Sequence, residues 1–144
     1  MGEAKQLQFD TGVITYNING KVELSFNPAD VSFIERLYGV VEELDRKQEK
    51  YKKTVEEAKD TKEVFEISRK IDGEMREALD GVFNQPVCGA LFDGMSIYAV
   101  STETGLPVWV NFILAILDES DASMTGAEGR ARDRLKKYTS KYHR

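Results

Sequence analysis

The fold is decided by residues 60–83, whose sequence is DTKEVFEISRKIDGEMREALDGVF. Apolar residues recur here at intervals of three or four, which is typical of a helix with one buried face. Asp60 and Glu63 have the spacing of a capping box, so the helix is expected to begin there. Asn84, Gln85 and Pro86 are expected to end it. The predicted stripe consists of Val64, Ile67, Ile71, Met75, Leu79 and Val82.

A second helix is predicted just before this one, over residues 28–58. Asn27 is its expected N-cap and Pro28 its first residue. Beyond Leu44 the chain is highly charged, so the two helices are expected to form an antiparallel helical hairpin over 28–83 with a charged tip. The tip is either a solvated face or a partner-binding site. The predicted stripe of this first helix consists of Val31, Ile34, Leu37, Tyr38, Val41 and Leu44, continued by Tyr51 and Val55.

The N-terminal residues 1–26 show the alternation of apolar and polar residues that is typical of strands. It begins at Leu7 and Phe9, is interrupted at Gly12 and resumes in two runs. These runs contain Ile14 and Tyr16, then Val22, Leu24 and Phe26. A single hairpin is marginal in water, so its apolar face needs a helix or another chain to cover it.

The turn of this hairpin can be predicted from the shared apolar face. A two-residue loop at Asn19 and Gly20 would put the two apolar sets on opposite faces. A three-residue loop of residues 18–20, with Gly20 left-handed, puts Tyr16 opposite Val22 and keeps them together. It also puts Ile14 opposite Leu24. The three-residue loop is therefore the prediction.

The segment 84–125 is more apolar than the rest. Residues 87–92 predict one or two helical turns, and 97–100 a brief extended stretch. Pro107 stands where a helix would begin, and 108–117 are apolar on nearly every side. Such a helix must be buried, either in the core or in contact with another subunit or a partner.

The basic tail, residues 126–144, holds seven basic and two acidic residues, a net charge of +5. Basic residues at a helix end suit the helix dipole. The tail is expected to be solvated or to dock on the acidic helices of its own chain. The alternatives are contact with an acidic partner and contact with nucleic acid.

These segments together predict a single α+β domain over 1–144. It has an N-terminal antiparallel β-hairpin region (1–26), a helical hairpin (28–83), an apolar C-terminal segment (84–125) and the basic tail (126–144). The 25 acidic and 20 basic residues give a net charge of −5, which argues against nucleic acid as the main partner. The lone Cys88, the absence of a secretion signal and the shortness of the apolar run 106–117 predict a cytoplasmic protein without a membrane span.

A catalytic site cannot be assembled from the residue types available. His143 is the only histidine and lies next to the chain end, and Cys88 stands alone, so neither a metal site nor a Ser-His or Cys-His pair is expected. Gly89, Gly94 and Gly105 are isolated and form no phosphate-binding loop. The prediction is a protein that is not an enzyme, has no cofactor and works by binding other proteins.

The order of the segments resembles a known family. The residues that carry the resemblance are VELSFNP at 22–28, IDGEM at 71–75, VFN at 82–84, VCGALF at 87–92, TGLPVWVNF at 104–112 and KYTSKY at 137–142, around a long charged helical hairpin. In this order they resemble the small tail assembly chaperones of long-tailed bacteriophages and of prophages of Gram-positive bacteria.

The resemblance implies a protein of the bacterial cytoplasm that binds the tape-measure protein, keeps it soluble, helps to recruit tail-tube subunits and is absent from the mature virion. Relatives are often also made in a longer, frameshifted form. The family has no short binding motif to transfer. Candidate partner-binding residues are therefore Trp109, Phe112 and Ile116, chosen for their apolar character, with Arg130 and Arg134 from the tail.

Two other functions fit the same residues. One is an unrelated cytoplasmic adaptor or oligomerising scaffold built on a helical hairpin. The other is a structural tail or head-completion protein that stays in the particle. Association into a homo-oligomer is compatible with each of them, whereas nucleic acid and membrane are not the expected partners.

Overall fold

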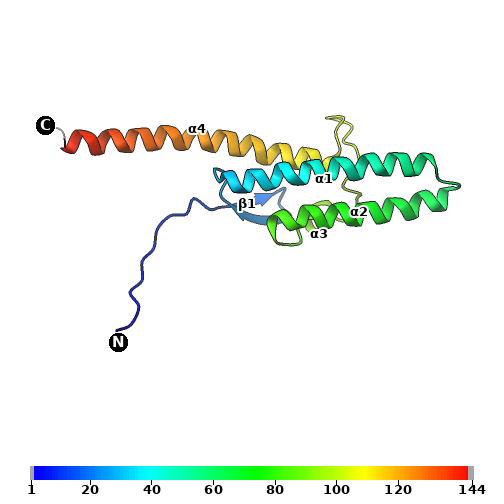
Figure 1. Ribbon diagram of the computed structural model, residues 1–144, viewed down its shortest axis with the longest axis horizontal. Coiled ribbons are helices and arrows are strands. Elements are labelled where there is room, and N and C mark those ends of the chain that lie inside the picture. Colours follow the sequence, from blue (N-terminus) through cyan, green and yellow to red (C-terminus); the bar gives the residue numbers. More distant parts are fainter. Residues whose placement is uncertain (1, 143–144) are drawn as a thin grey trace.

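The protein is an α+β fold in which a two-stranded antiparallel sheet precedes four helices (Figure 1). The computed structural model describes residues 2–142, without the side chains of residues 127, 128, 131, 132 and 134–142. The elements are β1 (Ile14–Ile18), β2 (Val22–Phe26), α1 (Val31–Glu56), α2 (Thr61–Phe83), α3 (Val87–Phe92) and α4 (Val108–Tyr142). The predicted fold class is thereby confirmed.

The β-hairpin keeps the predicted apolar face but has another register. Tyr16 pairs with Leu24 rather than Val22, and Ile14 pairs with Phe26 rather than Leu24. Asn19 and Gly20 both have positive φ, 54° and 69°, and the Lys21 N–H donates to the Ile18 carbonyl at 3.0 Å. Asparagine tolerates the left-handed region, so the three-residue loop begins one position later than predicted. The register shifts by two residues, which leaves every side chain on its predicted face.

The predicted strand at residues 6–9 is wrong. Residues 2–13 belong to no strand, and residues 2–10, hereafter the N-terminal arm, lead away from the body (Figure 1). Leu7 and Phe9 are 91% and 80% exposed. Their alternation favours an extended chain, but neither strand of the hairpin pairs with this segment.

The helix α1 begins at Val31, not at Pro28, and its cap is Asp30 instead of Asn27. The Asp30 carboxylate accepts the Ser32 N–H at 3.0 Å. The Asn27 side chain accepts the Ala29 N–H at 2.8 Å and so closes a turn ahead of the helix. The buried face is also rotated from the predicted stripe, because α1 is covered by both α2 and α4. Phe33, Leu37, Val40 and Leu44 are buried, whereas Val31 and Tyr38 are exposed.

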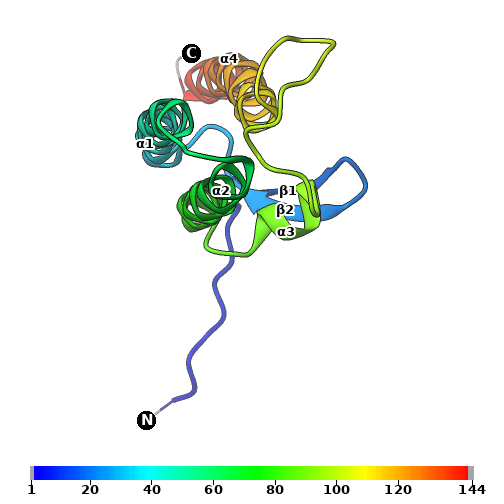
Figure 2. The ribbon, with the colours of Figure 1, turned by 90° about the vertical axis from the view of Figure 1, so that its right-hand side faces the viewer.

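The predicted start and stripe of α2 are confirmed. The Asp60 carboxylate accepts the Glu63 N–H at 2.8 Å, and the Glu63 carboxylate accepts the Lys59 N–H at 3.0 Å. Ile71, Met75 and Leu79 are buried. Asn84 ends the helix with a φ of 52°. The helices α1 and α2 lie side by side as the predicted helical hairpin (Figures 1 and 2).

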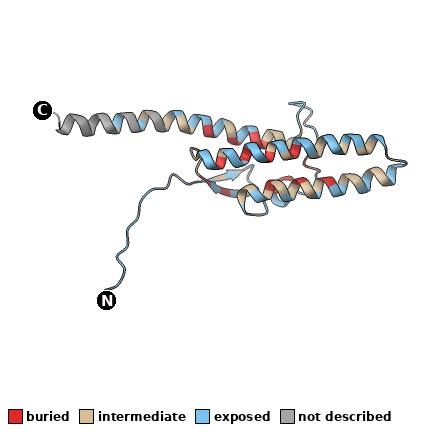
Figure 3. Ribbon diagram, in the orientation of Figure 1, coloured by how far each residue is buried: buried red, intermediate tan, exposed pale blue. Residues whose placement is uncertain are grey.

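The predicted helices at 87–92 and from 108 are confirmed as α3 and α4. The extended stretch at 97–100 is reduced to one bridge, between Val100 and Pro107. Seen end-on, α1, α2 and α4 form one group, and the β-hairpin and α3 lie to one side of it (Figure 2). Buried residues follow the facing sides of these elements (Figure 3), and α4 continues beyond the start of α1. Of the helices that the structure describes, none is long and apolar enough to cross a membrane.

Trp109 provides a test of this core. Its side chain is 1% exposed and its indole N–H donates to the Gln48 side chain at 2.8 Å, joining α4 to α1. We expect Trp109→Ala to lower the free energy of unfolding by about 3–5 kcal/mol, because a large buried side chain is replaced by a cavity. Thermal unfolding followed by circular dichroism measures the change. A variant that melts like the wild type would contradict the packing of α4 on α1.

Candidate functional site

Among the residues that the structure describes, no group of three or more His, Cys, Asp and Glu side chains could hold a metal ion. The thiol of Cys88 is buried and donates to the Arg76 carbonyl at 3.7 Å. Burial raises the pKa of this thiol above its ordinary value of 9.0, and the neighbouring Asp80 raises it further. Cys88 is therefore a neutral core residue rather than a nucleophile.

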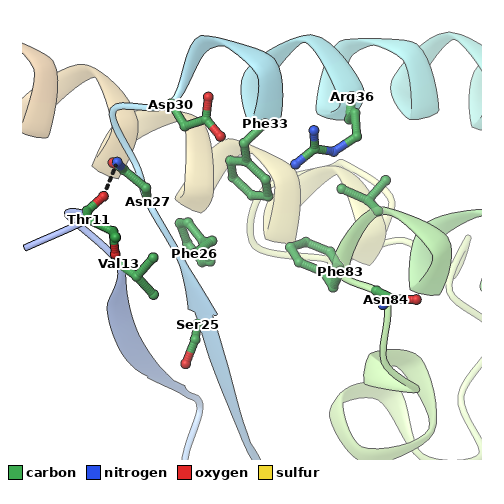
Figure 4. A pocket seen from close by; sticks show the side chains of 11 residues that line it. Thr11, Val13, Ser25, Phe26, Asn27, Asp30, Phe33, Arg36, Phe83 and Asn84 are labelled. Carbon is green, nitrogen blue, oxygen red and sulfur yellow. Dashed lines mark hydrogen bonds between the residues drawn. The ribbon is translucent and has the colours of Figure 1, made fainter. Parts of the chain in front are cut away.

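A hollow of about 390 Å³, which we call the aromatic pocket, lies at one end of the helical hairpin. Its walls are the root of the N-terminal arm (residues 11–13), β2, the start of α1 and the end of α2 (Figure 4). Phe26, Phe33 and Phe83 form its floor. The rings of Phe26 and Phe33 are stacked with centroids 4.7 Å apart, and Phe83 lies 6.0 Å from Phe33. The floor is fixed because these rings continue into the core.

The rim of the aromatic pocket is polar. The Arg36 guanidinium lies 5.9 Å from the centroid of the Phe33 ring, close enough for a cation–π contact. Asp30 and Asn84 also line the rim. On the arm side, the Asn27 amide donates to the Thr11 carbonyl at 3.0 Å (Figure 4). An apolar floor with a charged rim can accept an apolar side chain whose neighbours are polar.

The second hollow, which we call the hairpin-tip groove, has a volume of about 440 Å³ and lies between the turn of the β-hairpin, the end of α3 and the first turns of α4. Its apolar residues are Ile18, Leu91, Phe92, Met95, Val108, Phe112 and Ala115. Met95 is 51% exposed. The groove therefore offers apolar surface at the turn of the hairpin, whereas the aromatic pocket lies at its open end.

Three of the predicted partner-binding residues lie in the core of the chain itself. Trp109, Phe112 and Ile116 are 1%, 7% and 3% exposed. Of the two alternatives for the apolar run, the structure shows burial in the protein's own core, and only an edge of Phe112 lines the hairpin-tip groove. That these residues also contact a partner remains a prediction.

The two predicted basic residues are placed differently. Arg130 is exposed and lines a hollow of about 500 Å³ beside the arm root, with Asp10 and Asn27. The side chain of Arg134 lies outside the described residues. The structure thus brings Arg130 to the arm root, whereas Trp109 lies in the first turn of α4 against Gln48 of α1.

The sequence reasoning missed a row of polar residues on α2. Asp72, Arg76 and Asp80 are spaced four apart, and the Arg76 guanidinium donates to the Asp72 carboxylate at 2.9 Å. The same guanidinium donates to the carbonyls of Asp93, at 2.8 Å, and of Met95. The i, i+4, i+8 spacing was the available signal, but it is equally typical of a solvated helix face. Phe33 and Phe83 were missed too, because neither belonged to a predicted stripe.

The environment of Cys88 predicts a specific pH dependence. In the folded chain the thiol keeps its proton to a higher pH than in the unfolded chain, so stability is full below pH 9 and is lost as the pH rises further. We expect the loss to be about 1.4 kcal/mol per pH unit. Urea unfolding between pH 7 and 10.5 measures it, and Cys88→Ala should lack this component. A difference between the two chains that stays constant over this range would contradict a buried neutral thiol.

Comparison of the chain with protein-family models, with curated proteins and with solved structures finds no match. The surface features of the described residues that bear on function are the aromatic pocket, the hairpin-tip groove, the exposed N-terminal arm and Arg130 of α4.

Proposed function

We propose that this protein is a non-catalytic tail assembly chaperone of a long-tailed phage or prophage, which binds the tape-measure protein and helps to recruit tail-tube subunits. The observation that carries the proposal is the aromatic pocket, a rigid apolar floor with a charged rim at one end of the helical hairpin. The segment resemblance supplies the identity of the partner. In this proposal the protein acts in the cytoplasm of the bacterial host.

The chemistry of the aromatic pocket suits one face of an amphipathic helix. A helix bound in a groove presents apolar residues at three- and four-residue intervals, with polar residues beside them. A large apolar side chain of the partner would lie on Phe33 and Phe83, and an acidic neighbour would meet Arg36. A tape-measure protein is a very long helical chain with apolar stripes, and covering those stripes keeps it from aggregating.

The positions of basic residues support a partner-binding site at the same end of the molecule. Arg36 lies on the rim of the pocket, and Arg130 lies beside the arm root. In the sequence, Arg130 belongs to the basic tail of residues 126–144, which has a net charge of +5. A basic region next to an apolar pocket favours a partner segment in which acidic residues flank the apolar ones, because opposite charges speed encounter.

The binding prediction uses two exposed residues of the pocket. We expect the double variant Val13→Asp, Arg36→Glu to weaken binding of the tape-measure protein at least about tenfold, because it puts two negative charges where an acidic, apolar helix would dock. The assay is co-expression with the tape-measure protein, followed by its soluble fraction and by calorimetry on the purified complex. Both side chains are exposed, so the melting temperature of the variant should stay close to that of the wild type.

The matched control carries equivalent changes elsewhere, Arg46→Glu on α1 and Phe65→Asp near the tip of the helical hairpin, both at exposed positions. It should bind like the wild type. If the control loses binding and the pocket variant keeps it, the partner site is the charged tip. If wild-type protein leaves the tape-measure protein insoluble and unbound, the chaperone proposal is wrong.

A second measurement separates a chaperone from a structural tail or head-completion protein. We expect mass spectrometry of purified virions to find tape-measure and tail-tube peptides but none from this chain, because a chaperone leaves before the particle is complete. Detection of this chain at a level comparable with the tail proteins would favour the structural alternative.

A further inference from the structure

The N-terminal arm exposes apolar side chains in the pattern of a strand that lacks a partner. Leu7 and Phe9 are the two most exposed large apolar side chains of the described residues, at 91% and 80%. In an extended chain they lie on one side and Gln6 and Gln8 on the other. The nine residues of the arm, 2–10, span about 30 Å when extended, which is enough to reach a neighbouring molecule.

The root of the arm is held in a conformation that leads away from its own β1. Asn27 donates to the Thr11 carbonyl at 3.0 Å, and the Gly12 N–H donates to the Asp10 carboxylate at 2.8 Å. Gly12 has a φ of 78°, and a Cβ at this position would lie 2.8 Å from the Asn27 amide nitrogen. Folding back onto β1 within the same chain would break the bond between Asn27 and Thr11. The arm accordingly points away from the body in both views (Figures 1 and 2).

The outer edge of β1 is the open edge of the two-stranded sheet. On β2 the opposite edge is covered, since α3 packs against it and the Gln85 amide donates to the Glu23 carbonyl at 3.2 Å. The Glu23 carbonyl accepts its bond from outside the sheet, so Asn17–Glu23 and, two residues along, Thr15–Ser25 are the pairs without hydrogen bonds between the strands. The backbone groups of Thr15 and Asn17 therefore point to the free edge of β1. Within residues 2–142, no turn, loop or side-chain hydrogen bond reaches these groups. Such an edge is a template for a further strand.

The surface next to this edge matches the arm. The hairpin-tip groove lies beside Ile18 of β1 and has Val108 and Phe112 of α4 on its other side. A strand added to β1 with the alternation of the hairpin would turn Leu7 and Phe9 towards the helices. Its glutamines would lie on the solvent face, where the Thr15 and Ser25 hydroxyls are 2.7 Å apart. Apolar residues thus meet the groove, and polar residues meet the polar face.

We propose that the N-terminal arm of one copy adds as a third strand to the free edge of β1 in a second copy, with Leu7 and Phe9 in or beside the hairpin-tip groove. Arm and edge are both present in every chain, so the pairing is self-complementary. Reciprocal exchange satisfies both edges and closes a symmetric dimer. The aromatic pocket takes no part in the pairing, so this interface is separate from the proposed tape-measure site.

The test is self-association of the purified full chain without any partner. We expect sedimentation equilibrium at micromolar concentrations to give a dimer for the wild type. Leu7→Asp, Phe9→Asp should raise the dimer dissociation constant at least about tenfold, because two apolar side chains no longer enter the groove. The melting temperature of the monomer should not change, since both side chains are exposed there. Phe65→Asp, a matched change on α2, should remain a dimer.

Hydrogen exchange locates the contact. In the wild type, alternate amides within residues 6–9 (those that face β1) and the amides of Thr15 and Asn17 should be protected together, and all should lose protection in Leu7→Asp, Phe9→Asp. Thr15→Pro removes an amide from the free edge without removing a hydrogen bond to β2, and it should also yield a monomer. Retained protection elsewhere in the hairpin shows that this variant still folds.

Three outcomes would overturn the proposal. One is a wild-type chain that stays monomeric at tens of micromolar with an unprotected arm. Another is a monomer whose arm is protected, which would mean that the arm folds back on its own β1. The third is a dimer that both arm-side and edge-side variants leave intact. Binding of the tape-measure protein can be measured on the monomeric variant, so failure of either proposal is visible without the other.

Discussion

A row of three charged side chains on α2 holds α3 and the irregular segment that follows it, and the position of α4 depends on this row. The Asp72 carboxylate accepts the Ile97 N–H at 2.8 Å, and the Ile97 carbonyl in turn accepts the Trp109 N–H at 3.0 Å. Four residues on, Arg76 holds the carbonyls of residues 93 and 95, and the Asp80 carboxylate accepts the Cys88 N–H at 2.9 Å. Polar backbone groups that helices and strands would otherwise satisfy are satisfied here by side chains, which lets a loop-rich segment pack against the core.

The position of α4 then stabilises the β-hairpin. Two strands alone are marginal in water, but the Tyr16 hydroxyl donates to the Glu119 carboxylate of α4 at 3.0 Å, and Leu24 and Phe26 are buried under the helices. Aromatic contacts run from Tyr16 through Phe26, Phe33 and Phe83 to Phe112. The floor of the aromatic pocket belongs to this chain of rings. A surface built from core side chains is rigid, so a partner can dock there without ordering the protein first.

The parts of this fold that the sequence predicts well are those in which two local signals agree. In α2 the capping box and the apolar stripe give the same start and the same buried face. In α1 the local signals conflict. Both Asn27 and Asp30 can cap a helix, and Pro28 favours the earlier start. The choice of Asp30 depends on the turn that Asn27 closes. The register of the hairpin was missed for a similar reason, since a shift by two residues keeps every apolar residue on the same face.

The candidate site was less predictable, because a pocket is a property of surfaces that meet only in the fold. Trp109 and Ile116 have the apolar character of binding residues, but that character is equally typical of a core, and the structure shows both buried in the chain's own core. Phe33, Phe83 and Arg36 gave no signal of their own, since they come together only where β2 meets two helices. The row on α2 looked like any exposed helix face because its partners are backbone carbonyls and amides, which carry no sequence signature.

The root of the N-terminal arm is where the two proposed interactions meet. Thr11 and Val13 line the aromatic pocket, and the residues just before them form the arm. The Asn27 amide that holds Thr11 therefore fixes both a wall of the pocket and the direction in which the arm leaves. The floor of the pocket belongs to the core and the root of the arm forms only its wall, so the two proposed surfaces adjoin at residues 11–13 without sharing the residues that would hold either partner.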